Sequence, residues 1–249
     1  MTKELSGRVA IVTGAGRNIG RAIAFALADG GAAVVVNARS NLKEAEAVAS
    51  EIERGGGKAL AVTADVADAD AVGTMVAAAA SRFGRIDILV NNAAVRVEQA
   101  LETMTLADWR AVTGVILDGA FNCVKACLPH LKQSGAGAIV NIGGLSAHTG
   151  AAHRPHVVTA KAGLIGFTRA LAHELAPDKI RVNTVTPGVM SAPRPAGQPE
   201  PQHHSLVHAL VGRRGEPSDI AAAVRFLCGP GASFITGQNI QVNGGMFLG

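Results

Sequence analysis

Short runs of apolar residues alternate along the chain with longer segments in which apolar residues recur every three or four positions. The short runs have the length and unbroken hydrophobicity of strands that are buried on both faces of a sheet. The longer segments have the periodicity and composition of helices. Strands are predicted at residues 9–13, 33–37, 59–63, 86–91, 138–142, 181–186 and 240–242, and helices near 19–29, 41–54, 69–82, 105–132, 156–176 and 217–228.

This strict alternation predicts an α/β fold, a parallel sheet with helices on both faces. No linker, repeat or low-complexity block interrupts it, so we expect residues 1–249 to form a single domain. One stretch is irregular, because residues 191–215 follow the sixth predicted strand and are rich in Pro, His and Arg. We expect this stretch to form a flap over the ends of the strands, where ligands bind in such sheets.

The first predicted strand runs directly into a glycine-rich turn, residues 14–20, and then into a helical segment. Strand, glycine turn and helix in this order form a phosphate cradle. The backbone can approach a pyrophosphate closely where side chains are missing, and the helix N-terminus offers unpaired N–H groups. The pattern predicts a Rossmann-type, doubly wound sheet of about seven strands that binds a nucleotide. A tight turn with no ligand is the alternative reading of the glycines alone.

Two arginines stand at the expected nucleotide site. Arg39 follows the second predicted strand, where no acidic residue is present, and Arg17 lies inside the glycine turn. An acid after this strand would bind a ribose 2′-hydroxyl, whereas a guanidinium suits a 2′-phosphate. The two arginines therefore favour NADP(H) over NAD(H) as the cofactor. The alternative for each is an exposed, solvated side chain.

Composition limits the other classes of function. Hydrophobic residues make up 48% of the chain and charged residues 17%, which indicates a sizeable buried core. The net charge is +4, but the lysines and arginines are scattered and stacking aromatics are few, so we expect no nucleic-acid partner. The three cysteines are expected to be buried thiols in a reducing cytoplasm, and no metal site is expected. No apolar run approaches the length of a membrane span and the start lacks a secretion signal, so we expect a cytoplasmic protein without a membrane partner.

Five motifs occur in the order and at the spacing of one protein family. They are Thr13–Gly20, Asp65-Val66, Asn91–Ala94, Arg181–Gly188 and Gly237–Gly245. With these motifs the chain resembles the short-chain dehydrogenase/reductase superfamily, and most nearly its 3-oxoacyl-(acyl-carrier-protein) reductase-like members, from Gly7 to the C-terminus. Asn18 stands where the family usually has its second glycine. Asparagine is among the few residues that tolerate a positive φ, so we expect the turn to survive the change.

The resemblance implies an NAD(P)(H)-binding oxidoreductase that acts on a carbonyl or alcohol. It also implies the residues that contact the cofactor. These are Gly14, Gly16, Arg17, Asn18, Ile19, Gly20, Arg39, Asp65, Val66, Asn91, Ala93, Lys161, Pro187, Gly188 and Val189.

The family's catalytic residues are an Asn, a Ser, a Tyr and a Lys, and of these only the lysine, Lys161, is retained. The tyrosine position holds Val157, the serine position Gly144 and the asparagine position Ile116. The chain contains no tyrosine at all, so no shift of the alignment restores the usual acid. A valine cannot donate a proton, and loss of a general acid costs about 10²–10⁴-fold in rate. The resemblance therefore implies an atypical mechanism.

Other polar residues before the retained lysine are candidates for proton transfer. Ser146 and His153 are the stronger ones, with His148 behind them. Pro155 suits a first helical turn, which leaves His153 in the preceding loop, and His156 points away from the lysine's face by roughly 140°. Histidine can act as an acid near neutral pH. The alternative is that all of them are solvated loop residues.

Cationic residues gather at the predicted mouth of the site. They are Arg96, Arg154, Arg194, Arg213 and Arg214, with His203, His204 and His208 in the flap, where Glu200 is the single acid. This excess of positive charge predicts an anionic small-molecule substrate, with a carboxylate, a phosphate or a carrier-linked acyl group. Ordinary surface charge is the alternative.

Three functions remain open from the sequence. The first is carbonyl/alcohol redox chemistry with NADP(H) by an atypical route. The second is a catalytically inactive, nucleotide-binding homologue or partner subunit, and the third is a non-redox enzyme on the same scaffold. The resemblance also implies a homo-oligomer, a dimer or tetramer, formed through the long helices near 105–132 and 156–176; their apolar residues could instead be domain core.

Overall fold

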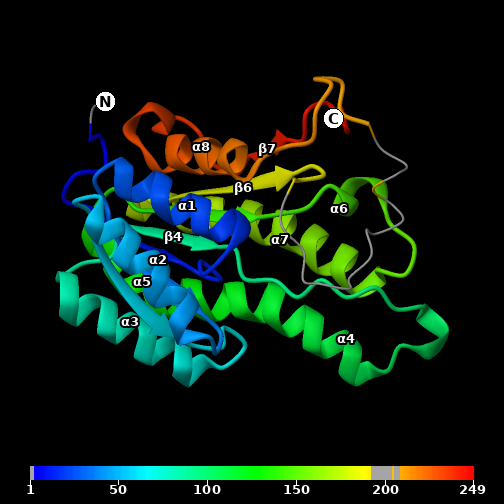
Figure 1. Cartoon of the computed structure of the whole chain (residues 1–249), viewed down its shortest axis with the longest axis horizontal. Helices are drawn as coiled ribbons and strands as arrows, with labels where there is room; N and C mark the ends of the chain where they lie inside the picture. Colours follow the sequence, from blue (N-terminus) through cyan, green and yellow to red (C-terminus); the bar gives the residue numbers. More distant parts are fainter. Residues whose placement is uncertain (1–2, 192–203, 205–207) are drawn as a thin grey trace.

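The computed structural model describes residues 3–191, 204 and 208–249, and they form a seven-stranded parallel sheet between two layers of helices (Figure 1). The strands are β1 (Val9–Val12), β2 (Ala33–Ala38), β3 (Lys58–Thr63), β4 (Ile88–Asn91), β5 (Ala138–Ile142), β6 (Arg181–Pro187) and β7 (Asn239–Val242). Their order is β3-β2-β1-β4-β5-β6-β7, so the direction of the order reverses between β1 and β4. The expected Rossmann-type sheet is confirmed.

Helices cover both faces of this sheet. They are α1 (Asn18–Asp29), α2 (Leu42–Arg54), α3 (Ala69–Phe83), α4 (Leu106–Thr113), α5 (Gly119–Ser134), α6 (Ser146–Thr149), α7 (Pro155–Glu174) and α8 (Pro217–Cys228). Short 3-10 turns occupy Leu101–Thr103, Ala176–Asp178 and Pro230–Ala232. One layer contains α1, α2 and α8, and the other contains α3, α5 and α7 (Figure 1).

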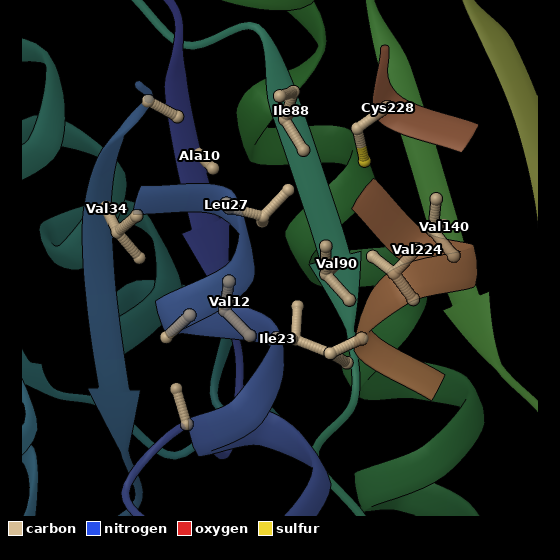
Figure 2. Close-up of a cluster of buried hydrophobic side chains, with 14 of the residues drawn as sticks. Ala10, Val12, Ile23, Leu27, Val34, Ile88, Val90, Val140, Val224 and Cys228 are labelled. Carbon is tan, nitrogen blue, oxygen red and sulfur yellow. The ribbon is translucent and has the colours of Figure 1, made fainter. Parts of the chain in front are cut away.

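The larger hydrophobic core lies under α1 and α8 (Figure 2). Ile23 and Leu27 of α1 and Val224 of α8 pack on the sheet, where Val12 of β1 and Val90 of β4 are fully buried. In β1 and β4, the residues directly before Val12 and Val90 belong to the hydrophobic core on the opposite face of the sheet. Each central strand is therefore buried on both sides, which explains why its sequence is a continuous apolar run and does not alternate.

All three cysteines are free and buried, as the sequence predicts. Burial raises the pKa of Cys123 and of Cys228 to about 12, and it also raises the pKa of Cys127 well above its usual value. These thiols are therefore protonated and unreactive at neutral pH. Within the described part of the chain, no group of three or more His, Cys, Asp and Glu side chains is placed to hold a metal ion.

The long helix predicted at 105–132 is divided into two α-helices by a π-helical segment, Gly114–Asp118. Helix α4 begins at a capping box in which Thr105 and Asp108 exchange hydrogen bonds. The π segment then widens the helix for one turn before α5 starts. Such segments often mark functional sites, and this one carries Ile116.

By length and composition alone, the continuous helical stretch Leu106–Ser134 could cross a membrane; it is the one such helix in the part of the chain that the structure describes. The same properties suit a helix that packs on a sheet. Here α5 lies against α3, β4 and β5, and α4 lies against α7. The absence of a membrane partner stays a prediction.

The two ends of the predicted flap, residues 191–215, are held together. Met190 and Gly215 form an isolated parallel bridge, and the Ser191 N–H donates to the Gly215 carbonyl at 2.7 Å. The Gly215 N–H in turn donates to the Val189 carbonyl at 3.0 Å. Residues 192–203 and 205–207 lie outside the described residues, so the flap itself stays a prediction.

Candidate functional site

The switch in strand order places the turn after β1 beside the turn after β4. Hydrogen bonds join the two turns. The Thr13 hydroxyl accepts the backbone N–H groups of Asn92 at 2.9 Å and Ala93 at 3.0 Å. The Asn92 side-chain amide donates to the carbonyls of Thr13 at 2.8 Å and Gly14 at 3.0 Å. The crevice where doubly wound sheets bind their ligands is thus fixed at its base.

The glycine turn leaves no room for side chains. Gly14 has a φ of +60°, and a Cβ on Gly20 would lie 2.2 Å from the Gly14 carbonyl oxygen. Asn18 has a φ of 49°, which confirms that asparagine can take the positive φ required at this position. Arg17 occupies the N-cap of α1 in an extended conformation without a side-chain cap, and the first turn of α1 contains no acidic residue. The unpaired N–H groups and the positive dipole end of α1 therefore face the glycine turn.

Polar and basic residues line the outer end of this crevice. Arg39 comes directly after β2, and both Arg39 and Arg17 are exposed. Asp65 follows β3 and is half-buried, with one carboxylate oxygen accepting the Ala67 N–H at 3.0 Å. Val66 packs against Gly119, where a Cβ would lie 2.6 Å from the valine side chain. The sequence motifs that predicted the nucleotide site are brought together here.

A buried chain of polar side chains runs behind the crevice. Asn91 donates to the Asn141 side-chain oxygen at 2.8 Å, Asn141 donates to the Thr168 hydroxyl at 2.8 Å, and Thr168 pairs with Thr184 at 2.7 Å. This series of hydrogen bonds is unsatisfied at its Asn91 end, because the Asn91 side-chain oxygen is buried and has no hydrogen-bond partner. Asn91 lines a small cavity together with Thr13, Ala93 and residues of the π segment and the start of α5. A buried acceptor without a partner is costly, which favours a donor from a ligand at this place.

The turn after β6 forms the inner wall. The Pro187 carbonyl accepts the Leu145 N–H at 3.1 Å, and the Val189 N–H lies 3.3 Å from the Met246 sulfur. Gly188 is packed so closely that a Cβ would lie 2.9 Å from that same sulfur and from the Asn243 backbone. This wall therefore also requires a residue without a side chain.

The residues at this edge fit a dinucleotide. They provide a turn without side chains, an uncapped helix N-terminus for phosphates, and a buried acceptor that lacks a donor. Gly16 and Ile19 belong to the same turn, and a Cβ on Gly16 would lie 3.1 Å from Glu44 of α2. The backbone is thus the surface presented to a ligand here.

Lys161, which the resemblance assigns to the family's catalytic set, is buried in α7. Its ammonium group donates to the Ile142 carbonyl at the end of β5, at 2.5 Å. Burial, together with the weaker effect of the nearby positive charges of Arg96 and Arg154, lowers the pKa of Lys161 to about 7. A lysine in this state exchanges its proton near neutral pH.

The resemblance expects the family's other catalytic residues at Ile116, Val157 and Gly144, and the first two of these are buried and apolar. Ile116 from the π segment and Val157 from α7 are 2% and 3% exposed, and both belong to one apolar cluster with Leu164. Gly144 has a different character, because a Cβ there would meet only the Lys161 side chain, at 3.7 Å. That is ordinary van der Waals contact, so the serine position is empty but not blocked.

The candidate proton donors differ from one another in burial and in the residues that they contact. Ser146 is buried as the first residue of α6. His153 lies in the loop before α7, as predicted, and is exposed, with a φ of 58° that is rare outside glycine. It lines a cleft of about 440 Å³ with Glu102 and Pro155. His148 stacks on Phe247 with ring centroids 4.8 Å apart.

The reading of all four residues as solvated loop positions is wrong for three of them. Ser146 is buried, His148 is half-buried against the C-terminal segment, and His156 is fully buried. His148 Nε2 shares hydrogen bonds with the side-chain amides of Asn239 at 2.9 Å and Gln241 at 3.2 Å. Their burial and contacts come from how α6 and α7 pack, which sequence position alone does not reveal.

Only part of the predicted cationic mouth lies within the residues that the structure describes. Arg194, Glu200 and His203 lie outside the described residues. Arg213 forms an ion pair with Asp219 at the start of α8, at 2.7 Å, so its charge is used within the fold. Arg154 is 7% exposed and lies immediately before α7, and Arg96 is exposed in the loop after β4. Of the described residues of the predicted mouth, these two arginines are the ones whose charges lower the pKa of Lys161.

Comparisons with known proteins agree with this geometry. A family model described as "Enoyl-(Acyl carrier protein) reductase" matches residues 14–247. The 3-oxoacyl-[acyl-carrier-protein] reductase FabG of Staphylococcus aureus is 40% identical over 240 residues, which cover 96% of this chain and 98% of that protein. A 3-oxoacyl-[acyl-carrier-protein] reductase of Synechocystis sp. is 41% identical over 246 residues, covering 98% of each. The crystal structure of a dehydrogenase/reductase from Sinorhizobium meliloti superposes with a TM-score of 0.92 at 36% identity, covering 99% of this chain and 98% of that one.

Proposed function

The chain belongs to the short-chain dehydrogenase/reductase family, and from this premise we propose that it binds NADP(H) and catalyses redox chemistry on a carbonyl or alcohol substrate. When bound, NADP(H) supplies or accepts the hydride. The observation that carries the proposal is the intact crevice, in which the side-chain-free turn of Gly14 and Gly20 stands beside the turn that carries Asn91 and Asn92.

The choice of NADP(H) over NAD(H) is supported by Arg39 and Arg17. Both are exposed at the outer end of the crevice, and a guanidinium is the side chain best suited to a phosphate monoester. The residue after β2 is this arginine and not an acid that would hold a free 2′-hydroxyl.

The substrate class to test first comes from the relatives. The similar proteins of Staphylococcus aureus and Synechocystis sp. are named as 3-oxoacyl-[acyl-carrier-protein] reductases. A 3-oxoacyl thioester presents a ketone that is separated by one methylene from the thioester carbonyl, and Lys161 lies at the base of the site. We infer that the reacting group of the substrate is such a ketone or the corresponding alcohol.

The proposal assigns proton transfer to Lys161, because the chain holds no tyrosine. Its ammonium group lies at the carboxyl end of β5, its pKa is lowered to about 7 mainly by burial, and Gly144 leaves the adjoining space open. A general acid works best when its pKa is near the working pH. Ser146 and His153 remain the alternatives, with Ser146 buried nearby in sequence and His153 on the outer cleft.

A second candidate function is that of a nucleotide-binding subunit without redox activity. It is favoured by the apolar surroundings of Lys161, because Ile116 and Val157 fill the places of an amide and a phenol with aliphatic side chains. A subunit of this kind would bind the nucleotide as tightly as an active enzyme does and would turn over no substrate.

The experiment titrates NADPH and NADH and then follows nicotinamide absorbance with 3-oxoacyl thioesters, quinones and small ketones. The proposal expects saturable NADPH binding and slow oxidation of NADPH by at least one ketone. Tight binding without oxidation, with activity appearing only in the Gly144→Ser, Val157→Tyr variant, would support the second function. Conversion of a substrate without nicotinamide oxidation would indicate a non-redox enzyme.

A further inference from the structure

His148 is the side chain at which three segments of the chain meet. It belongs to the short helix α6, and its Nε2 atom lies 2.9 Å from the side-chain nitrogen of Asn239 and 3.2 Å from that of Gln241. Both amides belong to β7, the strand at the edge of the sheet. The imidazole ring also stacks on Phe247, which lies beyond the end of β7. His148 therefore joins α6 to β7 and to the segment that follows β7.

Backbone groups fix the direction of the hydrogen bonds that lead to this nitrogen. The Gly245 N–H donates to Asn243 Oδ1 at 2.9 Å, so the amide nitrogen of Asn243 points the other way and donates to the Phe247 carbonyl at 3.1 Å. The same nitrogen donates to Gln241 Oε1 at 3.1 Å. The amide nitrogen of Gln241 is thereby turned toward His148 as a donor.

Asn239 approaches the same nitrogen of His148 from elsewhere on β7. Its Oδ1 accepts the hydroxyl of the buried Thr186 at 2.7 Å, which leaves the amide nitrogen directed at His148. Two amide donors therefore converge on Nε2, so this atom has to be the acceptor of both. The hydrogen-bond network thus assigns a neutral imidazole with its proton on Nδ1.

Protonation of His148 would turn Nε2 from an acceptor into a donor that faces two other donors. The amide of Gln241 cannot rotate to accept from it without losing its bond from Asn243. Burial and, more weakly, the positive charge of Arg169 on α7 lower the pKa of His148 from its usual 6.5, and Arg169 is the charged group of the described residues that acts on it. The bonded arrangement is therefore complete above pH 6.5 and is lost as the pH falls from there through the lowered pKa.

The turn that follows β7, residues 243–247, also packs on the inner wall of the crevice; we call it the β7 turn. The Met246 sulfur lies 3.3 Å from the Val189 N–H, and a Cβ on Gly188 would lie 2.9 Å from that sulfur. The residue just before α6 donates its backbone N–H to the same wall, at 3.1 Å. His148 thus closes a ring of contacts in which α6 and the β7 turn both contact the wall and each other.

We propose that His148 is a positioning residue that holds the β7 turn against the inner wall only while its imidazole is neutral, so that acidification frees the turn and weakens nucleotide binding at this wall. Only the effect on the nucleotide rests on the proposed function. A histidine that merely fills space between α6 and β7 would hold the turn equally well in both protonation states, so dependence on pH distinguishes the two roles.

Two variants separate the effect of the proton from the effect of packing. In His148→Gln the side-chain oxygen can replace Nε2 as an acceptor but does not titrate, whereas His148→Leu removes the acceptor. His173→Gln is the matched control, because His173 is an exposed histidine in the last turn of α7.

The first experiment measures hydrogen–deuterium exchange of residues 243–249 without nucleotide, at about pH 7.5 and about pH 5.5, on either side of the usual histidine pKa. Each rate is divided by the intrinsic exchange rate at that pH. The wild-type protein and His173→Gln are expected to lose roughly tenfold of their protection on acidification, the effect of about one lost hydrogen bond. His148→Gln should keep its protection at both pH values, and His148→Leu should lack it at both.

The second experiment titrates the same four proteins with NADPH at both pH values. The phosphates of the nucleotide titrate as well, so the result is the difference between proteins and not the change in any one of them. On acidification the wild-type protein should lose roughly tenfold more affinity than His148→Gln does, and His173→Gln should follow the wild type.

Wild-type protection that does not change on acidification, or that is lost equally in His148→Gln, would overturn the inference. So would nitrogen NMR that finds the proton of the neutral His148 on Nε2. If His148→Leu fails to fold, the wild type and His148→Gln still decide. An NADPH affinity that falls alike in these two proteins would overturn the effect on the nucleotide. Absence of NADPH binding in every protein would contradict the proposed function, while exchange still decides the role of His148.

Discussion

Ile116 and Val157 lie in one buried apolar cluster, although one comes from the π-helical segment and the other from the first turn of α7. These are the positions at which the family resemblance places an amide and a phenol. Val112, Ala120 and Leu164 also belong to this cluster, so the side chains around Ile116 and around Val157 are apolar. Lys161, one turn after Val157, is left as the titratable group that faces the end of β5.

Restoring a phenol and a hydroxyl beside Lys161 should accelerate NADPH oxidation. In the Gly144→Ser, Val157→Tyr variant the new serine fits, since a Cβ at Gly144 meets only Lys161 at 3.7 Å. We expect a gain of about 10²–10⁴-fold in kcat, the usual contribution of a general acid. Steady-state kinetics with a 3-oxoacyl thioester provide the measurement.

The matched control for this variant is Gly144→Ser, Val157→Phe, which adds the same ring without the hydroxyl. Equal rates for the Tyr and Phe variants would show that any gain came from repacking the cluster of Ile116 and not from proton donation. The dissociation constant of NADPH should be the same in all three proteins.

Replacing Lys161 with methionine should stabilise the protein without nucleotide. The folded pKa of this lysine is lowered to about 7 from 10.5, chiefly by burial, so the unfolded chain holds the proton more tightly. Stability is therefore highest above the unfolded pKa and is lost as the pH falls toward 7. We expect Lys161→Met to raise the free energy of unfolding on the order of 2–4 kcal/mol at pH 7, less near pH 10.5.

Denaturant unfolding at the two pH values checks this expectation, with Arg82→Met on α3 as a surface control. A destabilised Lys161→Met protein at pH 7 would contradict it. The same variant should lose turnover, because the proposal assigns proton transfer to this side chain.

Arg39→Ala should weaken NADPH binding about tenfold or more and leave NADH binding unchanged. A phosphate monoester loses a charge-assisted hydrogen bond when the guanidinium is removed, and a free 2′-hydroxyl does not. Fluorescence titration of both nucleotides gives the two dissociation constants. A parallel loss of affinity for NADH would mean that Arg39 shapes the crevice and does not select the phosphate.

Asp87→Asn should lower stability by about 2–4 kcal/mol at neutral pH. The Asp87 carboxylate, fully buried before β4, accepts hydrogen bonds from Val9 N–H at 2.9 Å, Arg85 at 2.6 Å and Ser134 at 2.5 Å. Burial alone would raise the pKa of Asp87, but the bonds from Arg85, Ser134 and Val9 outweigh it and hold that pKa below its usual value. This stability is therefore present above the unfolded pKa of about 3.9 and is lost as the pH falls through the folded pKa.

Thermal melts between neutral pH and about pH 3 test the expectation for Asp87. The stability of the wild-type protein should fall at the acid end more steeply than that of Asp87→Asn. Identical acid profiles would show that the carboxylate is not ionised in the folded protein.

We propose that the chain assembles as a dimer or tetramer through α4, α5 and α7. Phe121, at the start of α5, is 50% exposed, which is unusual for a large apolar side chain unless it meets a partner. Phe121→Glu should shift the mass measured by light scattering toward a smaller species. An unchanged mass, or a wild-type monomer, would contradict this assembly.

The sequence predicted the sheet well because its strands are buried on both faces. Each predicted strand lies within two residues of the observed one at either end, and helices α1, α2, α3, α7 and α8 begin and end within two residues of prediction. Apolar runs without polar interruption leave little choice of structure. The positive φ of Asn18 was also predictable, because the glycine turn requires it.

The surroundings of Lys161 could not be predicted in the same way. The π segment that carries Ile116 looks like ordinary helix in the sequence, since its apolar spacing differs by a single residue. The burial of His156 and the bond from Lys161 to the Ile142 carbonyl depend on how α7 packs on β5. Such contacts are tertiary, and no local pattern encodes them. The positive φ of His153 had no signal in the sequence beyond the proline that follows two residues later.

The most direct test of the account is a single-turnover measurement of NADPH oxidation by the wild-type protein with a 3-oxoacyl thioester. The account predicts saturable NADPH binding followed by complete oxidation of the bound nucleotide, at a rate that falls as Lys161 loses its proton above about pH 7. Binding of NADPH with no oxidation at any pH, while Gly144→Ser, Val157→Tyr oxidises it, would contradict the account and identify a nucleotide-binding protein without redox activity.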